Sequence, residues 1–584
     1  MANLLKGRKA SHKASYESFD LSHNIYFSSS VGHILPVHYD LLLPQDKVRI
    51  KSHMFSRTME LLSAAPVNMV EHIDYYFVPL QTIYSLFPSL LSDTNEDVTQ
   101  SVFDRESFSD LFPTFYVDRF LNHTLPSQSN RTDTFFGFDI DKRGAYRLAD
   151  MFNLSGYQTE SDYTQDVQKL NILFPCAYQA VWQYFFRDDS RIDFDNTLFN
   201  LDSYYQAVND GIQLSGDAVN SYFRLNYRPW KKDVFTIASP SPLGGSGSFN
   251  HFGFSKDSKQ FTSFVEQWLT KIGGNAIIPE IVGSDGQNPN NQNNYSDVGF
   301  SNRSQSYAIQ QSLQQHRIAE AIEKLSSIWM QSGKNYKDMM SNLFGSKVQE
   351  QVTRPIYIGS DSAPFNVNEE VAQMTTGTGS IQDDTFESYT DAGQITGKGI
   401  ASNNPKDYTE FTAPCHGIFI ALFSVVPDAV YSGNMTDFVH TYYNRASFPN
   451  PVTDELGERP LYGFELNNIS INNNPLIKGW VPRFNELKLK PSTAHGAFKT
   501  SLKYWIPSHT LDLSFENSNY FAPFYIRPDY INSILLTPYD VSPSGISSTP
   551  QTYYDTDPFL HFFRIECYKA SKMSSFGVPS TYFG

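Results

Sequence analysis

The sequence is poor in cysteine and in charged residues. Three cysteines occur in 584 residues, Cys176, Cys415 and Cys567, and only 18% of the residues are charged. An odd number of widely spaced cysteines supports neither a disulfide framework nor a Cys-x-x-Cys motif. We therefore expect a chain without disulfides that folds in a reducing compartment.

Long apolar runs are also missing. The first residues, MANLLKGRKASHKASYE, contain no apolar segment of the kind that forms the centre of a secretory signal. No stretch approaches the roughly 20 apolar residues that a helix needs to span a bilayer. We expect neither secretion nor insertion into a membrane.

Sequence motifs of catalysis are missing as well. The patterns HExxH, GxSxG and paired Cys and His at metal-binding spacing do not occur. AGQITGKGI, residues 392–400, resembles a phosphate-binding loop but is one residue too short between its first two glycines, and Gly399 replaces the required Ser or Thr. No residue is indicated as a nucleophile or general base, so we expect no enzyme and no cofactor. A glycosidase-like pair of carboxylates stays open, because a single sequence does not show which carboxylates meet.

One acidic cluster is a weak candidate for a cation site. The segment RDDSRIDFDN contains Asp188, Asp189, Asp193 and Asp195, and carboxylates at close spacing suit Ca²⁺. The spacing is not that of an EF-hand, and an acidic helix end that runs into a loop is the commoner origin of such a cluster. We expect no metal there.

Aromatic residues, in contrast, are abundant, at 15% of the chain with 46 Phe and 35 Tyr. Such side chains suit pleated sheets and dominate the energetics of interfaces. Alternation of apolar and polar residues, or a continuous apolar run, predicts β-strands. These predicted strands cover residues 33–43, 67–78, 415–426, 497–505 and 559–569.

Few segments have helical periodicity. Pro175 stands where a first helical residue is expected, with Tyr178, Val181, Trp182 and Phe185 at helical spacing after it. Two further helices are predicted at about 306–331 and 336–343, and each is followed by a glycine. Long polar stretches cover residues 120–170, 241–305 and 360–410. Strands spread from residue 33 to 569 predict one β-barrel or sandwich whose first and last strands pair, with large excursions between strands.

The charge distribution gives two local exceptions to an acidic chain. The formal net charge of -16 argues against a general nucleic-acid surface, yet Lys6, Arg8, Lys9 and Lys13 precede the first acidic residue, Glu17. By itself such an arm is most often a solvated terminus. The second exception, RPWKKDVFT at 228–236, places basic residues around Trp230. It is either a nucleic-acid contact or a charged strand edge.

Motifs of one protein family follow one another along the chain. They are SFDLSHNIYFSSSVGHILPVHYDLLLPQDKVRI, YYFVPL, FPCAYQAVWQYFFRDD, RPWKKDVFT, RPIYIGSDSAPF, CHGIFIALFSVVPD, PRFNELKLKPSTAHGAFK and FLHFFRIECYKASKMSSFGVP. Each motif alone is weakly specific, but their occurrence in the order of that family is strong evidence for a resemblance. The chain resembles the major capsid proteins of the Microviridae, and is more similar to the gokushovirus-like branches than to compact members. NELKLKP, where relatives usually show a Tyr-rich segment, indicates a divergent branch.

The resemblance implies a single eight-stranded antiparallel jelly-roll barrel with large inserted loops and a few helices. Residues 1–30 would be a partly extended basic arm, and 31–584 one capsid domain, with 241–305 as the candidate protrusion at the three-fold axes. The implied function is the major capsid protein of a small icosahedral single-stranded DNA phage. About 60 copies, grouped as pentamers, would form a closed T=1 shell.

The same resemblance implies the partners and the place of the protein. The chain would be part of the virion, assembled in the cytoplasm of a bacterial host. Its partners would be other copies, packaged single-stranded DNA, minor virion and scaffolding or pilot proteins, and a host receptor such as a glycan. Inside a shell, the four basic residues of the arm would gain from phosphate contacts, so we expect DNA binding there that is independent of sequence and sensitive to salt.

Under this resemblance, RPWKKDVFT is interpreted as a motif that serves the structure of the subunit and not as a nucleic-acid contact. We expect Trp230 and Phe235 to pack inside the subunit, and Lys231, Lys232 and Asp233 to lie at a subunit boundary or the inner wall. A carbohydrate-binding β-sandwich on a surface protein is the alternative function. It predicts aromatic side chains exposed on one face, but usually also the secretory signal that is missing here.

Overall fold

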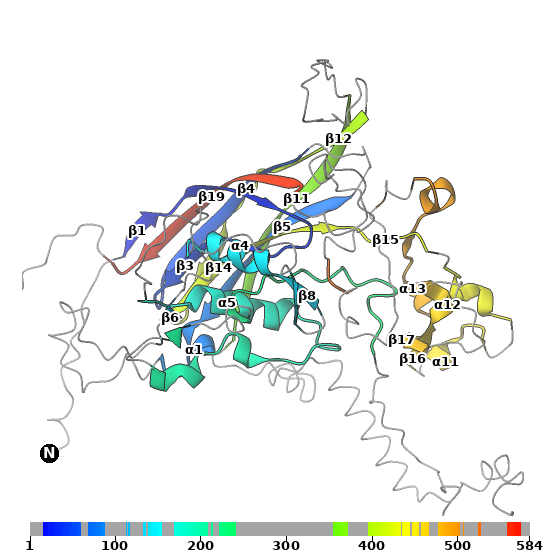
Figure 1. The fold of residues 1–584 in the computed structure, drawn as a ribbon, viewed down its shortest axis with the longest axis horizontal. Coiled ribbons are helices and arrows are strands. Elements are labelled where there is room, and N and C mark those ends of the chain that lie inside the picture. Colours follow the sequence, from blue (N-terminus) through cyan, green and yellow to red (C-terminus); the bar gives the residue numbers. More distant parts are fainter. Residues whose placement is uncertain are drawn as a thin grey trace, which may run out of the picture. The chain divides into compact units, whose positions relative to one another are not determined.

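A curled antiparallel sheet is the centre of the structure, a computed structural model (Figure 1). The residues that the structure describes are 16–59, 68–87, 113, 115–116, 132–135, 138–154, 169–207, 212–213, 221–240, 354–371, 395–433, 435–443, 447–454, 457–466, 477–502, 506, 524–526 and 557–573. They belong to one compact unit, made of residues 1–240 and 350–584. The second unit, residues 241–349, includes the expected protrusion and the two expected helices after residue 305, and it lies outside the described residues.

The order of strands in the main sheet is β1-β19-β4-β12-β11-β5-β14-β3, with β2 paired to β19 and β13 paired to β4. The bounds are β1 Glu17–Asp20, β2 His23–Ser29, β3 Leu35–Leu42, β4 Lys47–Thr58, β5 Met69–Pro79, β11 Ile356–Val371, β12 Ile395–Asn403, β13 Thr409–Thr412, β14 Gly417–Pro427 and β19 Phe559–Ser571. Every pairing in this sheet is antiparallel. The curled sheet with few helices confirms the expected mainly-β fold of jelly-roll type.

The predicted pairing of the first strand, 33–43, with the last is wrong, because β3 pairs with β14 at the other edge of the sheet, and the last strand pairs with β1, β2 and β4, which the sequence analysis did not predict. Strand β19 lies between β2 and β4, with Phe562 opposite Tyr26 and Cys567 opposite Ile50. Residues 17–29, placed by the sequence in the extended arm, are therefore strands β1 and β2 of the main sheet. The arm's four basic candidates, all before residue 16, lie outside the described residues.

The interior of the roll is aromatic. Strands β4 and β19 alternate between buried and accessible residues, so their inward side chains meet those of β5 and β14. Phe419, Phe423, Phe559 and Phe563 are among the largest fully buried side chains. Burial of each large aromatic ring stabilises a fold by about 1.5–3 kcal/mol. Part of the high content of Phe and Tyr in the sequence therefore stabilises this core.

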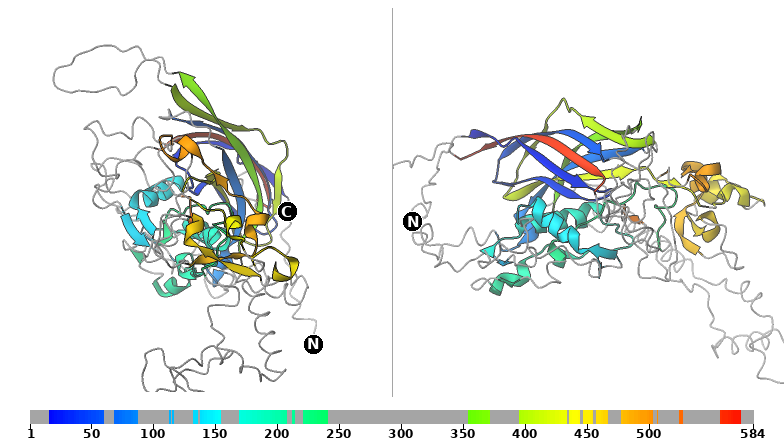
Figure 2. Two further views of the ribbon diagram at one scale, coloured as in Figure 1. Left: turned by 90° about the vertical axis from the view of Figure 1, so that its right-hand side faces the viewer. Right: turned by 45° about the horizontal axis from the view of Figure 1, so that its top comes forward.

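Helices cover one half of the sheet on its outer side (Figure 2). The outer side chains of β5 and β14, such as Tyr76 and Ile420, pack with Ala177 and Val181 of α5 in a second hydrophobic core. Because β14 is buried on both sides, it is apolar throughout. The helical bounds are α1 Leu80–Ile83, α4 Lys142–Met151, α5 Leu173–Val181, η3 Trp182–Phe186, η4 Asn196–Leu198 and η5 Asp202–Ala207. Among the described residues, no helix is long and apolar enough to cross a membrane.

Short elements from residue 430 onward form a satellite region beside the roll. They are β15 Val430–Tyr431, η6 Phe438–Thr441, α11 Pro451–Asp454, β16 Glu458–Tyr462, α12 Gly463–Leu466, β17 Ile477–Pro482, α13 Asn485–Lys488, β18 Ser492–Thr493 and η7 Gly496–Lys499. The remaining short strands are β6 Phe115–Tyr116, β7 Thr132–Phe135, β8 Phe138–Asp141, β9 Lys169–Leu170 and β10 Ile212–Gln213.

Three sequence predictions of local structure need correction. The stretch 360–410, expected as an excursion between strands, contains most of β11 and all of β12. The predicted strand 497–505 is wrong in its described part, because η7, Gly496–Lys499, is a 3₁₀-helix whose first residue has a φ of 64°; residues 503–505 lie outside the described residues. Helix α5 begins at Leu173, so Pro175 is still within the first turn but is not its first residue. Trp182–Phe186 then continue it as a π-helix.

The segment that resembles a phosphate-binding loop is part of a strand. AGQITGKGI runs into β12, where the Gly399 amide donates to Thr58 Oγ1 at 2.7 Å. A Cβ on Gly399 would lie 2.4 Å from the Phe365 ring. This glycine is therefore needed for a close approach within the sheet, and the segment does not cradle a phosphate.

Candidate functional site

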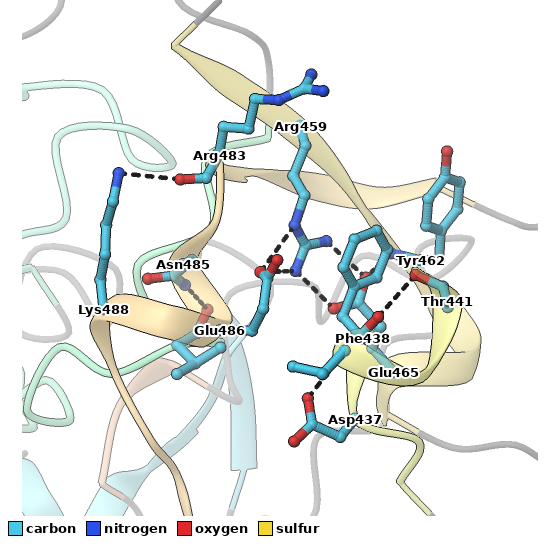
Figure 3. Close-up of polar contacts among 12 residues, drawn as sticks. Asp437, Phe438, Thr441, Arg459, Tyr462, Glu465, Arg483, Asn485, Glu486 and Lys488 are labelled. Carbon is cyan, nitrogen blue, oxygen red and sulfur yellow. Dashed lines mark hydrogen bonds and ion pairs between the residues drawn. The ribbon is translucent and has the colours of Figure 1, made fainter. Parts of the chain in front are cut away.

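Three of the sequence motifs meet in space. We call this place the junction and define it as residues 187–191, 228–239 and 480–486 with Tyr431 and Arg459. It joins the helical layer, the main sheet and the satellite region. The polar contacts of the satellite side are drawn in Figure 3.

Arg228 attaches the RPWKKDVFT segment to the sheet. Its guanidinium donates to Asp74 Oδ2 and to Ser424 Oγ, both at 2.7 Å, and these partners lie on β5 and β14. The Arg228 backbone also bonds to Gly32 and Ile526. Gly32 has a φ of 74°, and an added Cβ would lie 1.9 Å from the Ile526 carbonyl oxygen, so only glycine fits this crossing of chains.

Trp230 and Phe235 are buried, as the sequence analysis expects. Lys232 pairs with Asp188 at 2.9 Å within the same chain, and Lys231 is exposed. The aromatic residues of the motif thus pack inside the subunit, and the expected place of its charged residues at a subunit boundary or the inner wall stays a prediction.

Asp188 is the charged centre of the junction. It accepts from Arg191 at 2.5 Å, from Lys232 at 2.9 Å and from both the amide and the hydroxyl of Ser190. Burial acts to raise the pKa of Asp188, but Arg191, Lys232 and the Ser190 bond outweigh it and lower the pKa to about 2. The negative charge of this carboxylate is therefore balanced by basic side chains of the same chain.

Asp233 organises the turn that follows. Its carboxylate accepts from the amides of Phe235 and Thr236, and Tyr431 donates to it at 2.6 Å. Burial and then the Asp233 charge raise the pKa of Tyr431 above its ordinary value. The contact ties the turn to the first strand of the satellite region, where Asn485 also bonds to the Val234 carbonyl at 3.2 Å.

A buried arginine holds the satellite region together (Figure 3). Arg459 donates to both oxygens of Glu465, at 2.8 and 3.0 Å, and to Glu486 at 2.9 and 3.2 Å. Its Cζ lies 3.6 Å from the centre of the Phe438 ring, and Tyr442 donates to Glu486. Burial raises the pKa of Glu465 and opposes its ionisation, while the arginine favours the charged form.

Burial makes this arrangement structural. All three charged side chains are at most 7% exposed. Ions removed from water need such complete pairing, because a single orphaned charge would be strongly destabilising.

The four weak metal candidates do not converge. Asp188 is paired as described, Asp189 pairs with Arg187, and Asp195 caps η4 through the Thr197 amide at 2.9 Å. Asp193 is exposed. In the part of the chain that the structure describes, no three His, Cys, Asp or Glu side chains are grouped to hold a metal ion.

One constellation has the residue types of a hydrolase. Ser56 Oγ lies 2.8 Å from His561 Nδ1 and donates to Glu71 Oε2 at 2.9 Å, while Ser29 Oγ lies 2.8 Å from His561 Nε2. All four residues are buried inside the roll, and the Phe27 ring stacks on the imidazole. Because all four side chains are removed from solvent, the network satisfies buried polar groups and links the four strands β2, β4, β5 and β19.

Sequence reasoning missed Arg459, Glu465 and Glu486. Their partners are at sequence separations of 6 and 27 residues, on different elements, so no local period reveals them. The only signal was the unusual NELKLKP segment, which supplies Asn485 and Glu486.

The chain matches known proteins over most of its length. Residues 143–527 match a family described as "Capsid protein (F protein)". The curated protein "Capsid protein VP1" of Chlamydia phage 1 is 19% identical over 567 residues, which cover 86% of this chain and 87% of that protein. The family match includes the junction and strands β11, β12 and β14.

Replacing Arg459 by Met removes the only cation from the buried cluster and leaves two carboxylates facing each other. We expect a loss of about 3–5 kcal/mol in the free energy of unfolding, measured by urea unfolding. Arg459→Lys keeps the charge and is the matched control, with a smaller loss because it does not form the bidentate pair. Equal losses for the two variants would contradict a charge-pairing role.

Asp188→Asn is expected to destabilise the fold by about 2 kcal/mol at pH 7. A carboxyl whose folded pKa is lowered contributes stability above its unfolded pKa, near 3.8, and this contribution is lost as the pH falls through about 2. The difference between the wild type and Asp188→Asn should therefore fall to about half by pH 3. Unfolding measured at several pH values tests this, and a constant difference would argue against the ion pairs as its cause.

Proposed function

The chain belongs to the capsid protein (F protein) family, and on that premise we propose that about 60 copies assemble into a T=1 icosahedral shell around single-stranded DNA. Membership of this family makes the protein a structural component of a phage virion and not an enzyme. The family resemblance read from the ordered motifs is confirmed, and the carbohydrate-binding alternative loses its support.

The observation that carries the proposal is the combination of the family match with a rigid jelly roll. Strand β19 pairs with β2 and β4, so segments from both ends of the sequence share one sheet. The junction attaches the helical layer and the satellite region to this sheet. A subunit of a closed shell must keep fixed angles between its contact surfaces. Long-range strand pairing and buried ion pairs supply that rigidity.

Exposed aromatic and aliphatic side chains support assembly. Tyr443, Phe448, Val452 and Leu487 of the satellite region are each more than half exposed. Several large apolar side chains exposed in one region are typical of protein interfaces. The satellite region is therefore proposed as one of the surfaces that contact neighbouring copies in pentamers.

The remaining assignments follow from the resemblance. We propose that Lys6, Arg8, Lys9 and Lys13, at the start of the expected arm 1–30, touch DNA, and that residues 31–584 form the capsid domain together with strands β1 and β2. Residues 241–305 are proposed to form the surface protrusion that meets a host receptor such as a glycan. Assembly with minor virion and scaffolding or pilot proteins is proposed to take place in the bacterial cytoplasm.

Electron microscopy of the purified protein tests the proposed shell. We expect uniform icosahedral particles whose single-stranded DNA resists added nuclease. A protein that stays monomeric under all assembly conditions, or shells that never protect nucleic acid, would overturn the respective part of the proposal.

The basic arm has its own test. Replacing Lys6, Arg8, Lys9 and Lys13 by Ser should lower the salt slope of binding to single-stranded DNA by up to about 3, because each phosphate contact contributes about 0.7. The matched control removes the same charge elsewhere, at the four lysines 406, 488, 490 and 499. If both variants lose the same slope, the effect is one of net charge and the arm is not the contact.

A further inference from the structure

No element that the structure describes covers the outer side of one half of the roll. This surface, here called the uncovered face, is the solvent side of β2, β19, β4 and β12. The helices pack on the other half, against β5 and β14, and among the described residues no element packs on the uncovered face. Strand alternation places every second side chain of these strands there.

An apolar ridge crosses the uncovered face. Tyr26 lies opposite Phe562, with ring centres 5.8 Å apart, and Phe55 lies 6.2 Å from Phe562 on the other side. Ile400 continues the ridge on β12, diagonally across from Phe55. Tyr26 is 69% exposed, and the other three are 40–43% exposed. A continuous row of large apolar side chains on four strands marks an interaction surface.

Charged side chains surround the ridge, and more of them are basic than acidic. The basic residues of the face are Lys47, Arg49, Lys51, Arg57, Lys398 and Arg564, and the acidic ones are Asp20, Glu410 and Glu566. The whole chain has a net charge of -16, so the rest of its surface is more acidic still. The face is a basic patch on an acidic protein.

We propose that the uncovered face is a heterologous subunit interface, which docks onto a different and acidic surface of a neighbouring copy of this chain. The inference rests on the proposed shell, and it names one of the contacts that build it. Two copies of the face packed against each other would bring together two surfaces of net positive charge, which repel each other. A head-to-tail contact avoids this repulsion and generates closed rings.

An exposed segment with acidic and aromatic side chains lies on the opposite side of the same unit. Asp193 and Phe194 are exposed there, and Asp189 is exposed while it pairs with Arg187. Ile192 and Phe199 of the same segment pack into the core of the helical layer. The uncovered face and this segment therefore lie on opposite layers of the unit. Basic and acidic surfaces on opposite sides suit a ring in which each copy contacts the next.

The details of the face favour a protein over nucleic acid. Base stacking needs ring faces that stand free, but the Tyr26 and Phe562 rings pack edge to face at 71°. Lys51 and Arg49 already pair with Glu566 and Glu410, at 3.1 and 2.9 Å. A phosphate would have to displace these carboxylates, whereas an aromatic centre with a charged rim is the usual anatomy of a protein interface.

Footprinting of the wild-type protein tests the contact without a substitution. Hydroxyl radicals should oxidise Tyr26 and Phe562 in dissociated subunits and several-fold less in assembled shells. The protection should be equal in empty and DNA-filled shells, because a second copy provides it. Protection in filled shells alone would assign the face to DNA, and unchanged oxidation on assembly would show that nothing docks there; either result overturns the inference.

Substitutions test the energetics. Phe562→Ser and Arg564→Glu should each raise the protein concentration needed for half assembly about tenfold or more, as expected for an interface hot spot. Phe562→Leu and Arg564→Lys are the matched controls, with much smaller shifts. Unfolding midpoints in dissociated subunits establish that the variants fold. Folded Ser and Glu variants that assemble like the wild type would refute the interface.

Failure of the inference and failure of the proposed function give different results. A wild type that forms no shell or ring contradicts the proposed function, and the face with it. A wild type that forms shells while all four variants do so equally contradicts only the interface.

Discussion

Strand β19 is the element on which the rest of the structure depends. It lies between β2 and β4, so residues more than 500 positions apart in sequence are hydrogen-bonded neighbours. This pairing attaches β19 to the curled sheet around the aromatic interior, where Phe563 of β19 meets Phe423 of β14 and Phe559 meets Phe365 of β11. Contacts of such separation form only when most of the chain is in place, so the roll is completed by its last strand.

Pairing between distant strands explains why large excursions are compatible with one fold. The excursions leave from and return to strands whose positions are set by the ladder, and loop closure becomes only slowly more unfavourable with length. The junction adds a second level of order, because it attaches the helical layer and satellite region through buried polar contacts. Asp188, Asp233 and Arg459 each join two or more elements, and each is paired within the chain.

The two halves of the roll have different surroundings, and this difference connects the fold to assembly. The half with β5 and β14 is covered by helices and is apolar on both sides. The half with β19 and β4 alternates, and its outward residues form an aromatic ridge with a basic rim. Because the chain is acidic and this face is basic, contacts between surfaces of opposite charge are favoured and contacts between surfaces of the same charge are disfavoured.

Much of this could be predicted from the sequence, and the rest had a definite physical reason for escaping prediction. The strands at 35–42, 69–79, 417–427 and 559–571 follow from alternation or continuous apolarity, and the order of motifs reveals the family. Alternation at 497–505 misled, because Gly496 turns the chain into a 3₁₀-helix there. Pairs such as Asp188 with Lys232, or Arg459 with Glu486, join elements far apart in sequence, and no local pattern encodes them.

The sequence by itself therefore determined which side chains share a strand face, how aromatic the core would be and to which family the chain belongs, since these are properties of periodicity, composition and motif order. Only the tertiary structure decided which face the helices cover and which stays open. Strand periodicity places Tyr26, Phe55 and Phe562 on one side of their strands, but whether that side meets a helix, a neighbouring copy or water depends on contacts between distant segments.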